Sequence, residues 1–410
     1  MKPPELIPHL FRTEFQKITA VLCNRFGFDI IEFAEDIASE TFLAAQESWP
    51  YKGLPENPAA WLHTVARHKA LNHLRRSKLF RDKVSPTLAA GFTEAVVPDI
   101  DWSPGNIRDS QLRMMFAICE PSIPADAQVA LALRILCGFG IEEIAAAFLT
   151  NKETINKRLS RGKGKLRQAN LQFDVLTIVE INQRIEPVLT VLYLIFNEGY
   201  QSESNDEVVR SSLCAEAMRL CYQLVELEAT NLPIVHALYS LMCFQASRLG
   251  ARRSREGEII LYRDQDTSLW DRQLISKGGY HLNLAAQGKH LSTYHLEAGI
   301  AFWHTIKEDS LNKWENILHL FNQLLQIRYS PVAALNRSYA LSKVKGNQVA
   351  ILETEKLGLK DNQYYHALLG ELYKEIDPVK SRSYFETALE LAKTSTAKDT
   401  FRSHIERLNP

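Results

Sequence analysis

The chain has 410 residues, of which 46% are apolar and 23% are charged, and its 48 basic residues balance its 48 acidic ones. This composition is typical of a soluble globular protein of two or three domains, and it argues against disorder, a collagen-like rod or a coiled coil. Because the net charge is zero, any argument for nucleic-acid binding must come from local clusters of charge.

Helical periodicity covers most of the chain. Apolar residues recur at helical spacing over 10–80, 106–170 and 175–410, and no alternating series predicts a sheet. Residues 81–105 are rich in turn formers and predict a linker. The sequence therefore predicts an all-α fold. Its expected segments are a helical domain at 1–80, a linker at 81–108, a second helical domain at 109–172 and a large helical extension at 173–410.

Charge divides the N-terminal part into one acidic and two basic segments. Residues 28–56 contain seven acidic residues and one basic residue. Residues 61–83 and 151–170 each contain seven basic residues and one acidic residue. A neutral protein that concentrates positive charge in this way is expected to bind a polyanion at two places. The alternative for either cluster taken alone is a solvated helix face.

Two further patterns bear on cellular context and on metals. The six cysteines form no CxxC pair, residues 1–15 lack the apolar core of a signal peptide, and the apolar run 188–196 is too short to span a bilayer. We therefore expect a cytoplasmic protein without membrane association. His63, His68 and His73 are five residues apart and follow different faces of a helix, whereas a helical zinc site needs a spacing of four. We expect no metal and no cofactor.

The segment 125–167 has the pattern of a helix-turn-helix. Gly138 and Gly140 are expected to end its first helix, and Asn151 is a favourable N-cap for its third. A recognition helix enters the major groove by its N-terminal half, so the outward residues of the third helix are expected to contact DNA. These residues are Lys152, Glu153, Asn156, Lys157, Arg158, Ser160 and Arg161. Lys163, Lys165 and Arg167, with Arg158, are expected to lie along phosphates. The alternative is a helical hairpin with a basic face.

Two stretches of sequence carry a family resemblance. SETFLAA (39–45) and AWLHTVARHKALNHLRR (60–76) resemble region 2 of a bacterial RNA polymerase sigma factor of the extracytoplasmic-function (ECF) group. GIEEIAAAF (140–148) and TINKRLSRGKGKLR (154–167) resemble its region 4. The resemblance implies a non-enzymatic factor that binds core RNA polymerase and promoter DNA.

The resemblance also implies roles for individual residues. The acidic helix is expected to dock on the clamp helices of the largest polymerase subunit, and region 4 on the flap of the second-largest. The implied polymerase contacts are Glu35, Asp36, Glu40, Phe42 and Leu43. The implied contacts for binding and melting the minus-ten element are Tyr51, Asn57, Trp61, His63, Arg67, Asn72, Arg75 and Arg76. For Trp61 we favour a core position over a base-stacking one.

The extension at 173–410 resembles the tetratricopeptide-like C-terminal part of one ECF subgroup. VLYLIFNEGY (191–200) and LYRDQDTSLWD (261–271) are among the motifs that carry the likeness. The resemblance implies control of sigma activity in cis, with a protein or peptide as a potential partner. The polar and aromatic residues of these motifs suit a ligand pocket or an interdomain contact, although helix capping and buried hydrogen bonds explain them more simply. They are Asn197, Glu198, Asp264, Gln265, Asp266 and Trp270.

Two other classes of function compete with this interpretation. A free-standing helix-turn-helix regulator with a sensing domain would use the segment 125–167, but it would not need the acidic SETFLAA helix or the AWLHTVARHKALNHLRR helix. An enzyme in the extension would need a recognisable motif, and we find no GxSxG, HExxH or glycine-rich phosphate loop.

Overall fold

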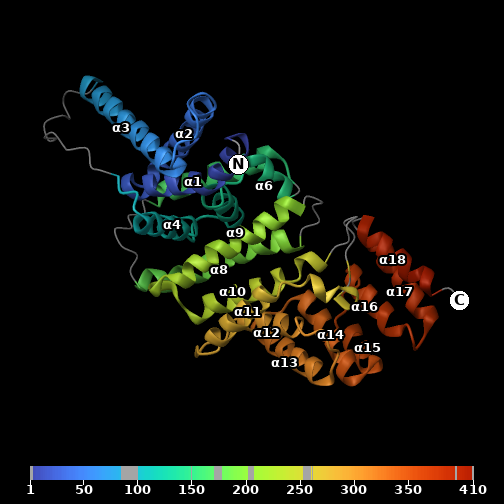
Figure 1. Cartoon of the computed structure of the whole chain (residues 1–410). Coiled ribbons are helices and arrows are strands. Elements are labelled where there is room, and N and C mark those ends of the chain that lie inside the picture. The colour runs from blue at the N-terminus through green and yellow to red at the C-terminus, as the bar shows by residue number, and fades with distance from the viewer. Residues whose placement is uncertain are drawn as a thin grey trace. The chain divides into compact units, whose positions relative to one another are not determined.

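The computed structural model describes residues 3–84, 100–148, 150–169, 178–201, 207–252, 260, 262–392 and 395–408. All regular structure within these ranges is helical, which confirms the predicted all-α fold (Figure 1). The chain divides into two compact units, Met1–Thr230 and Asn231–Pro410. The first unit therefore also contains residues 173–230, which the sequence assigns to the extension.

The first unit contains nine of the labelled helices. They are α1 (Pro3–Phe26), α2 (Ile31–Lys52), α3 (Pro58–Val84), α4 (Pro104–Ile118), α5 (Ala125–Leu131), α6 (Ile141–Ala147), α7 (Lys152–Gln168), α8 (Ile178–Gln201) and α9 (Glu207–Glu226). Short turns join them: η1 (Phe28–Ile30), the π-helical η3 (Ala132–Leu136) that continues α5, and η4 (Glu228–Thr230).

Helix α1 lies at the centre of the first unit because it is buried by several neighbours at once. It packs against α2, α3, α4 and η3, and Phe15, Ile18 and Leu22 are fully buried. Gly27 has a φ of 97°, a left-handed conformation that glycine adopts without strain, and it turns the chain from α1 toward α2.

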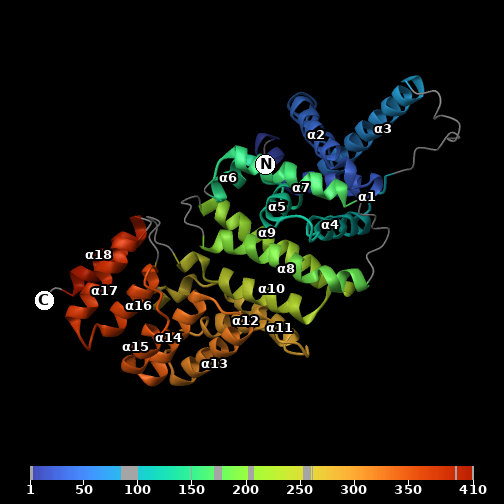
Figure 2. The same ribbon diagram turned by 180° about the vertical axis from the view of Figure 1, so that it is seen from behind.

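The segment 125–168 contains three helices, α5, α6 and α7. Gly138, with a φ of 70°, ends the η3 turn, and the Asn151 side chain accepts a hydrogen bond from the Thr154 backbone N–H, as expected of an N-cap. The apolar face of α7 (Ile155, Leu159 and Leu166) is buried. Figure 2 shows α7 beside α5, against which it packs.

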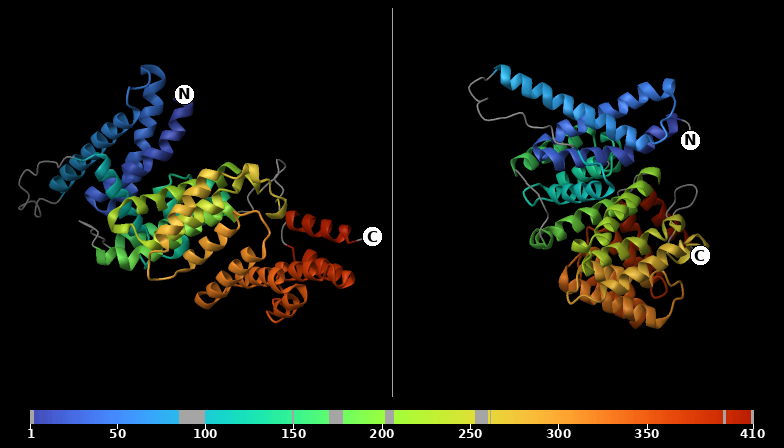
Figure 3. Two further views of the ribbon diagram at one scale, coloured as in Figure 1. Left: turned by 60° about the horizontal axis from the view of Figure 1, so that its bottom comes forward. Right: turned by 60° about the vertical axis from the view of Figure 1, so that its left-hand side comes forward.

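The second unit consists of helices that pack mainly on their neighbours along the chain (Figure 3). They are α10 (Pro233–Ala246), α11 (Arg272–Ala285), α12 (Thr293–Trp303), α13 (Leu311–Ile327), α14 (Pro331–Lys345), α15 (Asn347–Glu355), α16 (Gln363–Tyr373), α17 (Pro378–Leu391) and α18 (Ser395–Arg407). The turns η5 (Leu249–Ala251), η6 (Tyr262–Asp264) and η7 (Thr267–Leu269) lie between α10 and α11.

Successive groups of two or three helices in the second unit have their own apolar clusters. One cluster joins α12, α13 and α14 around Ile317, the next joins α14, α15 and α16 around Leu369, and the last joins α17 and α18 around Phe385. A Cβ added at Gly370 would lie 2.9 Å from the Phe385 ring, so a glycine is needed where α16 crosses α17. Such a series of local cores is typical of stacked helical hairpins.

The crossing of α7 over α5 generates a stability prediction. A Cβ at Gly162 would lie 2.7 Å from the buried Leu131 side chain, whereas Gly164 has no atom within 4 Å of such a Cβ. We expect Gly162→Ala to lower the free energy of unfolding by about 1–3 kcal/mol through overpacking. Gly164→Ala, the matched control, should raise it by up to about 1 kcal/mol because alanine favours a helix. Denaturant unfolding of the full chain measures both, and an equal effect of the two substitutions would contradict the tight crossing.

Candidate functional site

The predicted polymerase-facing residues of α2 divide into an exposed and a buried group. Leu43 is 55% exposed, and Asp36 and Glu40 are also exposed; the Glu40 carboxylate accepts a hydrogen bond from Lys69 of α3 at 2.9 Å. Phe42 is instead buried, with its ring 5.0 Å from that of Phe11 in α1. Glu35 is buried as well. The exposed group is available to a partner, and the buried group is not.

The Glu35 carboxylate forms ion pairs with two basic side chains from the segment 125–168. Its Oε1 lies 3.2 Å from Nε of Arg134 in η3, and its Oε2 lies 2.5 Å from Nζ of Lys163 in α7. One turn earlier in α2, Glu32 pairs with Arg167 at 3.1 Å. The acidic helix α2 and the basic helix α7 are therefore joined directly within the first unit.

A groove lies beside these contacts. It has a volume of about 530 Å³ and is lined by Phe11 of α1, by Phe42 and Leu43 of α2, and by Gly138 and Gly140 in the turn before α6. Its lining is mostly apolar and continues the exposed Leu43 surface. Two of the five residues predicted to dock a polymerase, Phe42 and Leu43, thus line this groove.

The predicted minus-ten residues at the start of α3 have different environments. Tyr51 is 90% exposed, and it lies in the last turn of α2. The Asn57 side chain accepts a hydrogen bond from the Ala60 backbone N–H at 3.0 Å, so it caps α3. Trp61 is half-buried and packs edge-on against the buried Trp49 with ring centroids 5.4 Å apart, so it only partly occupies the core position that we favoured.

The rest of this predicted set follows α3. His63 stacks on Trp102, and its Nε2 lies 2.9 Å from Oε2 of the buried Glu14. Burial raises the pKa of Glu14, but the hydrogen bonds from His63 and Lys17 outweigh it and leave the pKa below its ordinary value. Arg67 is half-buried, and Asn72 is exposed. The side chains of Arg75 and Arg76 lie outside the described residues.

Helix α7 exposes most of the polar side chains of its N-terminal half to solvent. Glu153, Asn156 and Ser160 are exposed, and so is Lys157. Lys152 is also exposed and pairs with Glu142 of α6. The other two predicted residues, Arg158 and Arg161, pair with the neighbouring helix α5.

Arg158 and Arg161 share one carboxylate. Nε of Arg158 lies 3.1 Å from Asp126 Oδ2 in α5, and Nη2 of Arg161 lies 2.8 Å from the same oxygen. Three of the seven predicted residues therefore form ion pairs within the unit, and the remaining four are exposed side chains on α7. Asp126 was not predictable from the sequence, because it lies 35 residues from Arg161 and only the crossing of α5 and α7 brings the two side chains together.

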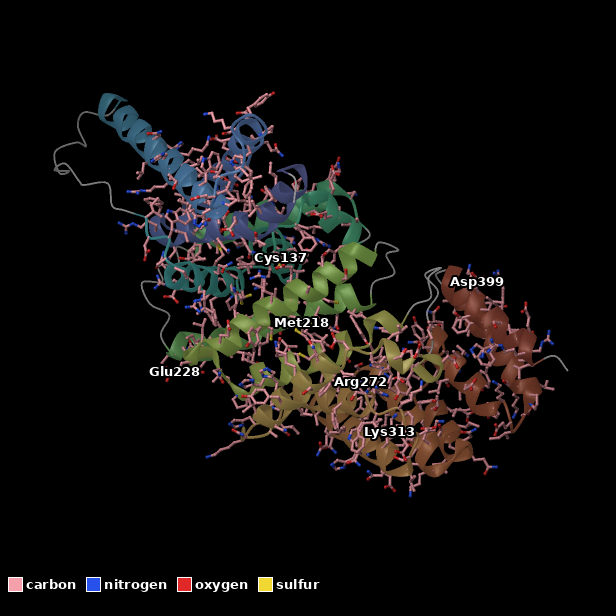
Figure 4. The ribbon with its side chains drawn as sticks, viewed as in Figure 1. Cys137, Met218, Glu228, Arg272, Lys313 and Asp399 are labelled. Carbon is pink, nitrogen blue, oxygen red and sulfur yellow. The ribbon has the colours of Figure 1, made fainter. Side chains whose placement is uncertain are left out.

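The motif 261–271 contains a half-buried tyrosine, Tyr262, in the second unit. The Tyr262 hydroxyl accepts a hydrogen bond from the fully buried Lys313 of α13 at 2.8 Å, and Lys307 donates to the Tyr262 and Gln265 carbonyls. The Trp270 ring stacks at 6.3 Å from the Tyr262 ring. Figure 4 labels Lys313 among the side chains of this unit.

Two other polar residues of that motif, Asp266 and Asp271, serve as caps. The Asp266 side chain accepts a hydrogen bond from the Ser268 N–H at 2.8 Å, and Asp271 caps α11. Asp264 is exposed, whereas Asn197 and Glu198 of α8 are half-buried. Capping and buried hydrogen bonds thus account for most of this motif. Lys307 and Lys313, which hold it, lie outside every motif that the sequence analysis singled out.

Comparisons with known proteins bear on the two units. Residues 22–79 match the family model Sigma-70 region 2, and residues 184–286 match a family of unknown function (DUF6596). "Uncharacterized protein R00370" of Rhizobium meliloti (strain 1021) is 32% identical over 394 residues, which cover 93% of this chain and 91% of that protein. The chain belongs to the same family as this Rhizobium protein. No solved structure matches the chain significantly.

The sigma-70 region 2 match covers α2 and most of α3, the helices that carry the predicted polymerase and minus-ten residues. It supports a sigma-factor role in transcription initiation, with core RNA polymerase and promoter DNA as partners. Among the described residues, no group of three or more histidine, cysteine or acidic side chains is arranged to hold a metal ion. None of the described helices combines the length and apolar character needed to cross a lipid bilayer.

Buried histidines of the second unit generate a pH prediction. Burial, aided by His236 and Lys277, lowers the pKa of His281 to about 4. Burial, aided by Arg248 and Lys313, lowers the pKa of His304 to about 3. Both residues are neutral in the folded chain at neutral pH, whereas the unfolded chain protonates them near pH 6.5. Below about pH 6.5 the unfolded state therefore binds more protons, and stability is lost as the pH falls toward about 4.

We expect denaturant unfolding of the full chain to show a lower midpoint at about pH 5 than at about pH 7. His281→Gln should flatten this dependence, and the same change at the exposed His290 should leave it unaltered. A pH dependence that is identical in wild type and His281→Gln would contradict the assignment.

Proposed function

We propose that the protein is an ECF-type sigma factor whose C-terminal extension modulates its activity. The observation that carries the proposal is the order of two surfaces in one chain: a sigma-70 region 2 at residues 22–79, followed by a basic helix, α7, with an exposed N-terminal half. A promoter-specific initiation factor needs both, one to hold the polymerase and open the duplex and the other to read a second element upstream.

In this proposal α6 and α7 form a region 4 helix-turn-helix. Asn156 and Lys157 are placed to read base edges, because asparagine suits adenine and lysine suits guanine in the major groove. Lys165 lies in the last turn of α7, where a cation adds affinity along the phosphates without sequence information. Region 2 contributes exposed Tyr51 and Asn72 together with the basic residues of α3 for binding the displaced strand.

The extension has a separate role in the proposal. With 26 basic and 29 acidic residues, the segment 173–410 is a poor candidate for DNA binding. The local apolar clusters from α12 to α18 support a tetratricopeptide-like stack of hairpins, an architecture that offers surfaces for a protein or peptide. We infer that this part regulates the sigma part in the same chain and that the protein catalyses no reaction.

A second function deserves a test because two predicted polymerase contacts, Glu35 and Phe42, are buried. A free-standing regulator that reads an operator through α7 and senses a ligand or protein through its second unit would not need them. The decisive experiment adds the purified full chain to core RNA polymerase. A stable complex and promoter-specific runoff transcripts support the sigma factor, whereas DNA binding without any association with polymerase supports the regulator.

The exposed face of α7 generates a mutational prediction. If Lys157 makes a bidentate base contact, Lys157→Ala should weaken binding to the upstream promoter element by about 1–3 kcal/mol and relax the base preference at one position. Arg161→Ala should likewise weaken binding to the upstream element by about 1–3 kcal/mol if Arg161 makes a bidentate base contact. The matched control is Lys165→Ala, which should weaken binding to all sequences alike. Holoenzyme binding to a set of single-base promoter variants measures these effects, and an equal loss on every variant would assign Lys157 to a phosphate.

A further inference from the structure

The ion pairs between α2 and α7 remove functional groups of both helices from solvent. The side chain of Glu35 is 8% exposed, that of Lys163 is 16% exposed and that of Arg134 is 18% exposed. Both carboxylate oxygens of Glu35 face a cation. A carboxylate this far from water is stable only while its cations remain, because the loss of one partner leaves a buried charge uncompensated. The contact therefore favours a single closed arrangement of α2 on α7.

The same two helices are the proposed binding surfaces for two different partners. Lys163 is expected to lie along DNA phosphates, and Glu35 is expected to face the polymerase. In the closed arrangement the Glu35 carboxylate forms an ion pair with the Lys163 ammonium, as a DNA phosphate oxygen would. Neither residue can serve its external partner while it binds the other. The more exposed pair between Glu32 and Arg167 lies next to this contact and adds little stability of its own.

The first hairpin of the extension, α8–α9, also stabilises this arrangement, through hydrogen bonds to α1 and η3. Nη2 of Arg219 in α9 donates to the Gln16 side chain of α1 at 2.9 Å and to the Leu136 carbonyl of η3 at 2.9 Å. Gln16 also accepts a hydrogen bond from Gln111 of α4, which in turn accepts one from Gln223 of α9. One arginine thus connects the helix that supports α2 to the turn that carries Arg134.

We propose that the α8–α9 hairpin is an internal inhibitor that fixes the chain in a closed state, in which Glu35 masks Lys163 and the polymerase-facing surface of α2 is incomplete. The proposal rests on the proposed sigma-factor function and adds its regulation. Activation then requires that α7 separate from α2, which exposes Glu35 to the polymerase and Lys163 to the promoter in one step.

The first test compares neighbouring residues of α2 in the full chain. Asp36 is exposed, so Asp36→Asn should only remove a polymerase contact and weaken binding to core polymerase. Glu35→Gln keeps the shape of the side chain but weakens the closed state. Because the apparent dissociation constant equals the intrinsic one divided by the fraction of competent molecules, a larger open fraction tightens binding, and we expect Glu35→Gln to bind core polymerase about fivefold more tightly than wild type. Binding as weak as that of Asp36→Asn would make Glu35 a plain polymerase contact and overturn the proposal.

The second test uses a residue that lies outside every proposed binding surface. Arg219→Met removes the connection between α1 and η3, and Arg402→Met removes an exposed arginine of α18 that pairs with Asp399. We expect Arg219→Met to enlarge the radius of gyration in small-angle scattering and to tighten polymerase binding, and we expect Arg402→Met to change neither. A folded Arg219→Met protein with wild-type radius and affinity would refute the role of the hairpin.

These outcomes are separable from the failure of the proposed function. If no variant and no wild-type chain binds core polymerase, the sigma-factor proposal fails. If all of them bind and Glu35→Gln binds no better than wild type, only the closed-state proposal fails. Glu35→Gln keeps the inference testable even where Arg219→Met destabilises the first unit.

Discussion

A carboxylate shut away from water requires cations at close range, and in the first unit Glu35 obtains them from two elements that are distant in sequence. Arg134 comes from the π-helical turn η3 and Lys163 from α7. This one requirement ties the sigma-70 region 2 helices to the basic helices that follow the linker. The burial of the Glu35 carboxylate and of the Lys163 ammonium depends on it.

Local chemistry was predictable from sequence wherever a residue acts on its own neighbours. Asn151 caps α7, Gly138 ends the preceding turn, and Ile155 and Leu159 face inward, because each of these outcomes is decided within one or two turns of helix. The sequence also indicated which helix carries exposed cations. These are properties of spacing and of intrinsic conformational preference, and no tertiary information is needed to derive them.

Long-range pairing was not predictable in the same way. Glu35 and Lys163 are separated by more than a hundred positions, and nothing in the pattern around either residue names the other. The sequence predicts Phe42 of SETFLAA as an exposed apolar contact, but in the structure its ring packs against Phe11 of α1. In the second unit Lys313 reads as an ordinary surface lysine of an amphipathic helix, yet the hydroxyl of Tyr262 and the Ile306 carbonyl surround its ammonium. Charge patterns predict that partners exist but not which partners they are.

The carbonyl at the end of η3 has a consequence for dissecting the molecule. The last carbonyls of a helix have no N–H partner within the helix, so they accept hydrogen bonds from other groups. At Leu136 the donor is Arg219, which comes from beyond residue 173. A fragment cut near 172 would lack this donor, and it would also uncover the sides of α4 and α5 against which α8 packs. The smallest stable piece therefore extends to about the end of η4, and shorter fragments would report the damage of truncation along with any gain in freedom.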